Sequence, residues 1–377
     1  MTRIPFTRPF RTREEDHALA ELIASGPVRR GARVLAFERA FAARVGAPHA
    51  VATTSHTAAL ELALHVAGVG PGDEVVVPSR PPSALADAVI RRGATAVFAD
   101  IDPLTYNIHA GAVEWLITPR TTAIVPVHQL GLPVDMDPLV ALAWHRGLAI
   151  IEDAASAVGA TYRVRPVGSL GPITCFSLHA SEVITTGKGG IITVRDASVA
   201  ERLCRLRRSA IDVPEPARNG EPHIANEADS CRGQNAYMTD AQAGRGLCQL
   251  RLLDAILRVR RKRAERYTAA LDGIHFVETP FEPDYARHTW QSYAVRVAPD
   301  AVGCNELMHR LRQDGVPTRP GLTPIDDKPR ARAGTWLPSA EATAQDSLML
   351  PLFPDMTDDQ QDYVIERLAE HVTALAI

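Results

Sequence analysis

Residues suited to chemistry lie in three separate stretches of the chain. In the first, Ser55-His56-Thr57 opens a helical pattern directly after an apolar segment. Free backbone N–H groups and the positive end of the helix dipole allow such a turn to hold a phosphate. An ordinary N-cap by Ser55 or Thr57 explains the same residues, so the spacing alone leaves both interpretations open.

Two further candidates stand at the ends of strand-like runs, where open α/β sheets bind ligands. Asp153 ends the run that begins at Leu148, and its carboxylate could cap the strand or pair with a cationic ligand. His128 follows the run 123–127, and histidine is a side chain that can transfer protons at physiological pH, so it is a catalytic candidate. A histidine at a strand end is more often a hydrogen-bonded structural group, and both roles stay open.

The third stretch runs from Cys175 to Gly190 and contains His179, Glu182 and Lys188. Burial can raise the pKa of a carboxyl group until it acts as a general base near neutral pH, which makes Glu182 a catalytic candidate. The sequence around Lys188 is not a phosphate loop. Glu182 stands where such a loop needs glycine, and Gly189 stands where it needs serine or threonine.

Short apolar runs alternate with helical patterns between about residues 50 and 200. The strand-like runs are 74–78, 96–99, 123–127 and 148–152, and the helical patterns between them are 57–68, 83–93 and 138–147. Alternation of this kind implies right-handed crossovers and a largely parallel sheet covered on both faces. We therefore predict the α/β class.

The pattern changes after residue 200. A short basic helix is expected at 197–210, a polar loop at 211–232 and a long helix at 239–271, followed by half-exposed strands and two more helices. We predict a large domain over residues 1–250, with an N-terminal helical arm at 10–45, and a small C-terminal α+β domain over 251–377. The basic run 258–263 is expected to be a solvated helix face.

Composition narrows the class of protein. The 377 residues are 46% hydrophobic and 23% charged with a formal charge of -3, and no cluster of basic residues indicates nucleic-acid binding. No apolar run is long enough to span a membrane, and no secretory signal is evident, so we expect a cytoplasmic protein. Five scattered cysteines without a C-x-x-C pair argue against a disulfide framework and against a metal site.

Several of these stretches resemble one family. The segment 175–190 is similar to the active-site segment of the DegT/DnrJ/StrS nucleotide-sugar aminotransferases, which use pyridoxal phosphate (PLP). Ser55–Leu60 resembles the family's S-G-T-A-A-L, and Gly233–Ala243 resembles its G-x-N-Y-R-M-T-D-x-Q-A. The resemblance extends over about residues 15–372. It implies a large domain of PLP fold type I with a mainly parallel seven-stranded sheet.

The resemblance also implies roles for individual residues. His56 and Thr57 fall where the family holds the PLP phosphate, and Asp153 falls where an aspartate pairs with the pyridinium nitrogen. Ser156 stands where the family places Gln or His against the ring. The retained Ser177 and Asn235 also match cofactor positions. Since the residue at Asn235 reaches the phosphate of a neighbouring subunit, the resemblance implies a homodimer with shared sites.

At position 182 the family has its Schiff-base lysine, and at position 188 it has a glutamate, so the two residue types are exchanged here. A carboxylate cannot form a Schiff base. We therefore predict a repurposed enzyme of nucleotide-sugar or natural-product biosynthesis without covalent PLP. It would act on a small polar metabolite such as a nucleotide sugar, with Glu182, His179, His128 or Lys188 transferring protons.

Three alternatives remain open at this point. PLP or pyridoxamine phosphate (PMP) could bind non-covalently. The chain could be a non-catalytic partner subunit that is kept for its dimer surface. It could also be a working aminotransferase in which Lys188 is a relocated Schiff-base lysine.

Overall fold

The computed structural model describes residues 4–13, 15–17, 20, 31–79, 83–208, 233–298, 303–321 and 337–375. Much of the predicted arm at 10–45 lies outside the described residues. The predicted loop at 211–232 and Cys231 lie outside them entirely.

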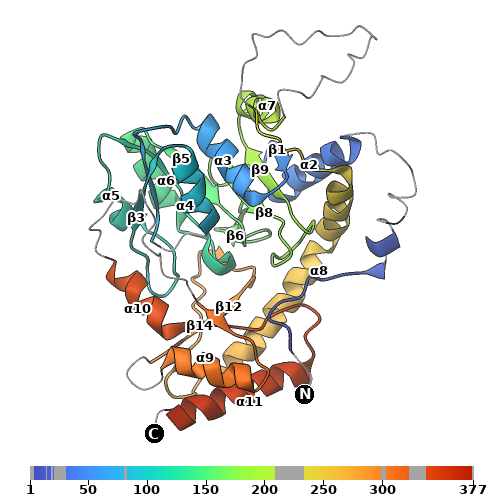
Figure 1. Cartoon of the computed structure of the whole chain (residues 1–377), viewed down its shortest axis with the longest axis vertical. Coiled ribbons are helices and arrows are strands. Elements are labelled where there is room, and N and C mark those ends of the chain that lie inside the picture. The colour runs from blue at the N-terminus through green and yellow to red at the C-terminus, as the bar shows by residue number, and fades with distance from the viewer. Residues whose placement is uncertain are drawn as a thin grey trace.

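A seven-stranded sheet forms the centre of the large domain (Figure 1). Its order is β1 (His49–Thr53), β9 (Gly190–Val194), β8 (Ile173–Ser177), β5 (Ala149–Asp153), β4 (Thr121–Ile124), β2 (Glu74–Pro78) and β3 (Thr95–Ala99). The pairs β2–β3, β2–β4, β4–β5 and β5–β8 are parallel. Only β9 runs antiparallel to both its neighbours. The predicted mainly parallel seven-stranded sheet is confirmed.

Helices cover both faces of this sheet, which explains why strands such as β2 and β8 are buried throughout. One core includes Phe37 and Phe41 of α2 (Ala32–Val45) and Leu139 of α6 (Met136–Arg146), which α5 (Ala110–Glu114) contacts. The opposite core includes residues of α3 (His56–Val66), α4 (Ser83–Arg91) and α7 (Ala197–Leu206). The result is the three-layer arrangement that the alternating pattern predicts.

The small domain is built on a four-stranded sheet in the order β10 (Val277–Glu278), β12 (Tyr293–Val297), β14 (Ser347–Leu350) and β13 (Arg319–Pro320). Helices α9 (Cys304–Gln313) and α11 (Asp358–Leu375) pack on it, and α10 (Pro338–Asp346) lies beside them (Figure 1). A separate three-stranded sheet joins β6 (Thr161–Tyr162) to β7 (Arg165–Pro166) and β11 (Ala286–Arg287).

The long helix α8 (Asp240–Leu271) connects the two domains (Figure 1). It begins with a capping box between Thr239 and Gln242. Leu253 and Ile256 belong to the large-domain core, whereas Tyr267 belongs to the small-domain core. One continuous helix thus sets the position of the small domain relative to the sheet.

One expectation about α8 is wrong. The basic run 258–263 is not a solvated face, because Arg260 is 1% exposed and Arg261 and Arg263 form ion pairs with Glu282 and Asp358. Residues outside the strands, among them Trp290 and Leu352, and helix α11 pack over this part of α8, and a run of like charges gives no sign of that cover.

Three features of the described residues concern membranes, metals and disulfides. No helix there is long and apolar enough to cross a membrane. The part of the chain with assigned positions contains no group of three or more histidine, cysteine and acidic residues able to hold a metal ion. Cys175, Cys204, Cys248 and Cys304 are free thiols.

Candidate active site

Three strands that run in the same direction bring the candidate residues together. β1 leads to His56, β5 ends at Asp153, and β8 leads through Ser177 towards Glu182. Carboxyl ends of parallel strands meet at one edge of the sheet, which is where open α/β sheets bind ligands. At this edge Gly190 of β9 passes so close to Ser55 that a Cβ would lie 2.5 Å from the Ser55 carbonyl oxygen.

His56 and Asp153 form a buried ion pair. The imidazole Nε2 lies 2.9 Å from Asp153 Oδ1, and both side chains are almost fully enclosed. The ring is not aligned for a good hydrogen bond, but the attraction between the charges needs no alignment. Burial alone would lower the pKa of His56. The carboxylates of Asp153 and Glu182 outweigh it, so the pKa is raised and the imidazolium form is favoured.

The second oxygen of Asp153 is the more unusual atom. Oδ2 is buried and has no hydrogen-bond partner among the described residues, while Oδ1 also accepts from the Ala155 N–H at 3.1 Å. A buried carboxylate oxygen without a partner costs free energy, and such an atom calls for an explanation, for example a catalytic role or a bound water or ion. Asp153 therefore has one acceptor atom that no described residue uses.

A tight loop holds Glu182 beside this pair. The Glu182 N–H donates to the His179 carbonyl oxygen at 3.1 Å, and the Thr186 N–H donates to the Leu178 carbonyl oxygen at 3.0 Å. Val183 and Ile184 are buried in the large-domain core. Ser156 Oγ donates to Glu182 Oε2 at 3.3 Å. The backbone of the loop is therefore held on both sides of Glu182, and Ser156, which follows β5, holds the carboxylate.

The surroundings of Glu182 bring the pKa of its carboxyl group close to neutral pH. The residue keeps some contact with the cavity described below, but protein atoms enclose its carboxyl group, and it is the burial of that group that governs its titration. Burial raises its pKa from 4.5 to about 7, against the opposing effects of His56 and Ser156. A carboxyl group with this pKa exchanges a proton readily at physiological pH.

Arg260 of α8 supplies a buried positive charge to the same region. Its Nη1 donates to the carbonyl oxygens of Trp290 and Gln291 at 3.0 and 3.2 Å, and no carboxylate within the described residues forms an ion pair with it. Burial lowers the pKa of Arg260 to about 10, and Glu182 is the anion that opposes this decrease. The guanidinium thus favours the ionised form of Glu182 from a distance.

A cavity of about 430 Å³ lies between the two domains at this edge of the sheet. The large domain contributes mostly small and polar side chains to its wall, namely His56, Leu130, Ala155, Ser156, Ser177, Ser181 and Glu182. The small domain contributes Gln291, Ser292, Arg319, Met349, Leu350 and Leu352, and the N-terminal segment contributes Phe6 and Thr7. No lysine is among these described lining residues.

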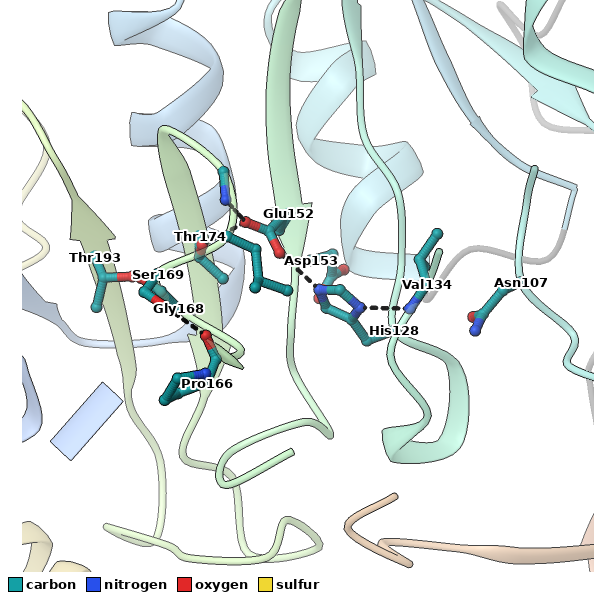
Figure 2. A network of polar contacts seen from close by, with 12 residues as sticks. Asn107, His128, Val134, Glu152, Asp153, Pro166, Gly168, Ser169, Thr174 and Thr193 are labelled. Carbon is teal, nitrogen blue, oxygen red and sulfur yellow. Dashed lines mark hydrogen bonds and ion pairs between the residues drawn. The ribbon is translucent and has the colours of Figure 1, made fainter. Parts of the chain in front are cut away.

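His128 does not reach this cavity. Its Nδ1 accepts the Val134 N–H at 3.0 Å, so Nε2 carries the proton and donates it to Glu152 Oε2 at 3.0 Å (Figure 2). Glu152 also accepts from Thr174 Oγ1 and from the Gly171 N–H. Both ring nitrogens are therefore used by the fold, which favours a structural role for His128 over the predicted catalytic one.

Replacing His128 with alanine is expected to destabilise the protein by about 2–5 kcal/mol, because two buried hydrogen bonds are lost, one of them to a carboxylate. Urea unfolding at pH 7.5 measures the change. His145→Ala, at an exposed position on α6, is the matched control and should change the free energy of unfolding by less than about 0.5 kcal/mol. A His128 variant as stable as the control would contradict the structural role.

The remaining candidates occupy different positions. Ser177 lies on the cavity wall and accepts the His179 N–H, and Thr57 is half-buried in the first turn of α3. His179, Lys188 and Asn235 are exposed in the single chain and do not line the cavity. His179 Nδ1 contacts Ser181 Oγ at 2.9 Å. Lys188 forms no ion pair with Glu182 in the described structure, so the exchanged residue types are not paired.

Three residues of the site were not singled out from the sequence. Arg260 lay within a run that resembled a solvated face, and Gln291 and Arg319 lie on the far side of the cavity, in the small domain. Gln291 Nε2 donates to the Ser181 carbonyl oxygen at 2.9 Å and so joins the two domains at the Glu182 loop. No local pattern marks such residues, because the contacts that define them are formed with residues at least 30 positions away.

The fold is that of PLP fold-type I aminotransferases, as solved structures show. The aminotransferase TlmJ from Streptoalloteichus hindustanus is 32% identical, with 99% of this chain and 100% of that chain covered and a TM-score of 0.91. DesV of S. venezuelae is 32% identical, with 99% of each chain covered and a TM-score of 0.86. The predicted fold class is confirmed.

The family follows from sequence comparison. The chain belongs to the DegT/DnrJ/EryC1/StrS aminotransferase family, whose model matches residues 9–369. It is similar to the spore coat polysaccharide biosynthesis protein SpsC of Bacillus subtilis, with 38% identity over 98% of this chain and 97% of the relative. It is also similar to the GDP-perosamine synthase of Caulobacter vibrioides, with 39% identity over 90% of each chain.

Proposed function

We propose that this chain is a lysine-less member of its family, an enzyme of nucleotide-sugar biosynthesis that transfers protons between Glu182, His56 and a sugar without covalent PLP. The observation that carries the proposal is the His56–Asp153 ion pair beside a buried carboxyl group whose pKa is about 7. A carboxylate and an imidazolium enclosed in one cavity are the two partners that acid–base catalysis needs.

The family is PLP-dependent, but the residues of this cavity do not fit covalently bound PLP. The resemblance assigns Asp153 to the pyridinium nitrogen, yet the His56 imidazole takes Oδ1 of that carboxylate. The resemblance also assigns a lysine to position 182, and a glutamate stands there among lining residues that include no lysine. Asp153 Oδ2 could still accept an N–H, so weak non-covalent binding of PLP or PMP remains compatible with the site. No step of the proposed chemistry depends on that group.

The cavity residues have complementary tasks. Glu182, in its ionised form, accepts a proton from a carbon next to a sugar carbonyl group. His56 donates a proton to the carbonyl oxygen, which leaves an enol and two neutral side chains. Asp153 keeps His56 protonated before the transfer, and Arg260 favours the ionised form of Glu182. If the proton from Glu182 returns to the former carbonyl carbon, the reaction is an isomerisation. If the original carbon is protonated on its opposite face, the reaction is an epimerisation.

The substrate class is inferred from the relatives and the cavity. One similar protein is named a GDP-perosamine synthase and another a spore coat polysaccharide biosynthesis protein. A cavity of about 430 Å³ lies within the range of small-molecule sites, roughly 300–1,000 Å³. Serine, threonine and glutamine side chains on its wall suit the hydroxyl groups of a sugar. These observations support a nucleotide sugar as the metabolite.

Deuterium exchange tests the proposal directly. The purified protein is incubated in D₂O with nucleotide-linked keto sugars, and proton NMR follows the signals of the carbons next to the carbonyl group. We expect catalysed loss of one such signal without any added PLP or amino donor. Purified protein with a visible absorption band that borohydride bleaches, together with amino-group transfer at ordinary rates, would overturn the proposal.

We further propose a homodimer in which the neighbouring chain completes the site. His179, Lys188 and Asn235 are polar residues near the cavity segments in sequence, yet they are exposed in the single chain. The resemblance assigns Asn235 to a neighbouring subunit's site. Light scattering gives the mass in solution, and a stable monomer that turns over substrate would contradict this arrangement. The alternative of a non-catalytic partner subunit predicts no exchange in D₂O and co-purification with an active homologue.

A further inference from the structure

Arg319 lies on the small-domain wall of the cavity, whereas Glu182 and His56 lie on its large-domain wall. It lies in β13 at the edge of the four-stranded sheet, where it pairs with Met349 of β14. Met349 and Leu350 line the same wall and give it an apolar surface. Arg319 is exposed in the single chain, and it is the one arginine or lysine among the described residues that line this cavity.

The N-terminal segment holds this guanidinium in place. Arg319 Cζ lies 4.4 Å from the centroid of the Phe6 ring, which is a cation–π contact. Ile4 is 3% exposed and belongs to the small-domain core, so the backbone close to Phe6 is anchored. Stacking on one face of a guanidinium leaves its N–H edge free to donate hydrogen bonds.

The charge of Arg319 is not neutralised within the described structure. Other arginines of the small domain have acidic partners: Arg296 pairs with Asp346 and Glu278, and Arg310 pairs with Glu306. For Arg319 no carboxylate among the described residues lies within ion-pair distance. Its neighbours on the wall include the hydroxyl group of Thr7, which can donate a further hydrogen bond to an anion, whereas the Ser292 hydroxyl already donates to Gln291 Oε1.

We propose that Arg319 binds an oxyanion of the substrate, either a phosphate or a carboxylate group. A guanidinium edge matches the two oxygens of such a group, and the Thr7 hydroxyl group can donate one more hydrogen bond to it. A molecule held there at one end reaches across the cavity to Glu182 and His56 with the other. This inference deepens the proposed function. It rests on that function only for the chemistry at Glu182 and His56, because binding of the oxyanion by Arg319 needs neither residue.

Calorimetric titration of the full-length protein tests the site. The probes are pyrophosphate and GDP for phosphate, and glutarate for carboxylate. We expect at least one probe to bind the wild type. Arg319→Gln should weaken it about 10- to 100-fold, because a charge-assisted bidentate contact is lost. Arg319→Lys should retain part of the affinity. Phe6→Leu should weaken binding by a smaller factor, about 2- to 5-fold, since the guanidinium loses its stacking partner.

Two controls make the result decisive. Arg312→Gln, at an exposed position on α9 of the same domain, should bind the probes like the wild type. Glu182→Gln should also keep probe affinity, so failure of catalysis and failure of this site are distinguishable. The phosphate and carboxylate probes decide which oxyanion is recognised. Equal affinity of the wild type and a folded Arg319→Gln variant, or no binding of any probe at millimolar concentration, would overturn the inference.

Discussion

Replacing Glu182 with glutamine is expected to lower kcat/KM about 10²- to 10⁴-fold, the usual loss when a positioned general base is removed. The amide keeps the size of the side chain and can still meet Ser156, but it cannot accept the proton. Glu366→Gln, exposed on α11, serves as the control for removing a carboxylate elsewhere. Turnover of the Glu182 variant at the wild-type rate would exclude Glu182 as the base.

The pH dependence of kcat/KM is a second test of Glu182 as the general base. Since the pKa of Glu182 is about 7, wild-type kcat/KM should rise as pH increases through 7, and the residual kcat/KM of the glutamine variant should not show this rise.

The raised pKa of Glu182 also affects the stability of the folded protein. The folded protein holds this proton between pH 4.5 and about 7, so the stability linked to the proton is present at low pH and lost as pH rises through 7. Glu182→Gln should therefore raise Tm relative to the wild type at pH 8 and much less at pH 5.

The second large effect is expected from the double variant His56→Gly with Glu182→Lys, which should regain covalently attached PLP. The lysine restores an amine, and the glycine removes the imidazole that pairs with Asp153. Glu182→Lys alone should bind PLP about 10- to 100-fold more weakly, because the His56–Asp153 contact must first be broken and the buried amine faces an imidazolium. Spectroscopic titration with PLP gives the affinities, and intact mass after borohydride reduction detects the attachment.

His56→Gly alone separates the two contributions. It should bind PLP without any mass increase after reduction, because no amine stands at position 182. If Glu182→Lys alone binds PLP as tightly as the double variant, the imidazole does not compete for Asp153. The proposed reason for the loss of the cofactor would then be wrong.

The His56–Asp153 ion pair of the wild type has a physical interpretation. An imidazolium on a buried aspartate reproduces the charge arrangement that a pyridinium would have there, from a side chain of the protein itself. Because Asp153 is 0% exposed, its negative charge needs a cationic partner. His56 meets this need and, in addition, carries a transferable proton.

Sequence alone determined the elements and the fold. The runs 74–78 and 96–99 form β2 and β3 almost as predicted, and the helical pattern at 239–271 is α8, because local periodicity reports which side of each element faces a core. The resemblance then supplied the family, which the matched residues 9–369 confirm. It also drew attention to Glu182, where the residue type by itself excludes a Schiff base.

Only the tertiary structure decided which candidates share a site. His56 and Asp153 are far apart in the chain and meet because β1 and β5 end at the same edge of the sheet. Lys188 is close to Glu182 in sequence but exposed, because the loop turns it away from the cavity, while Arg260 is buried despite its basic neighbours. Burial and charge pairing depend on what packs against a residue from distant segments, and a local pattern carries no information about those segments.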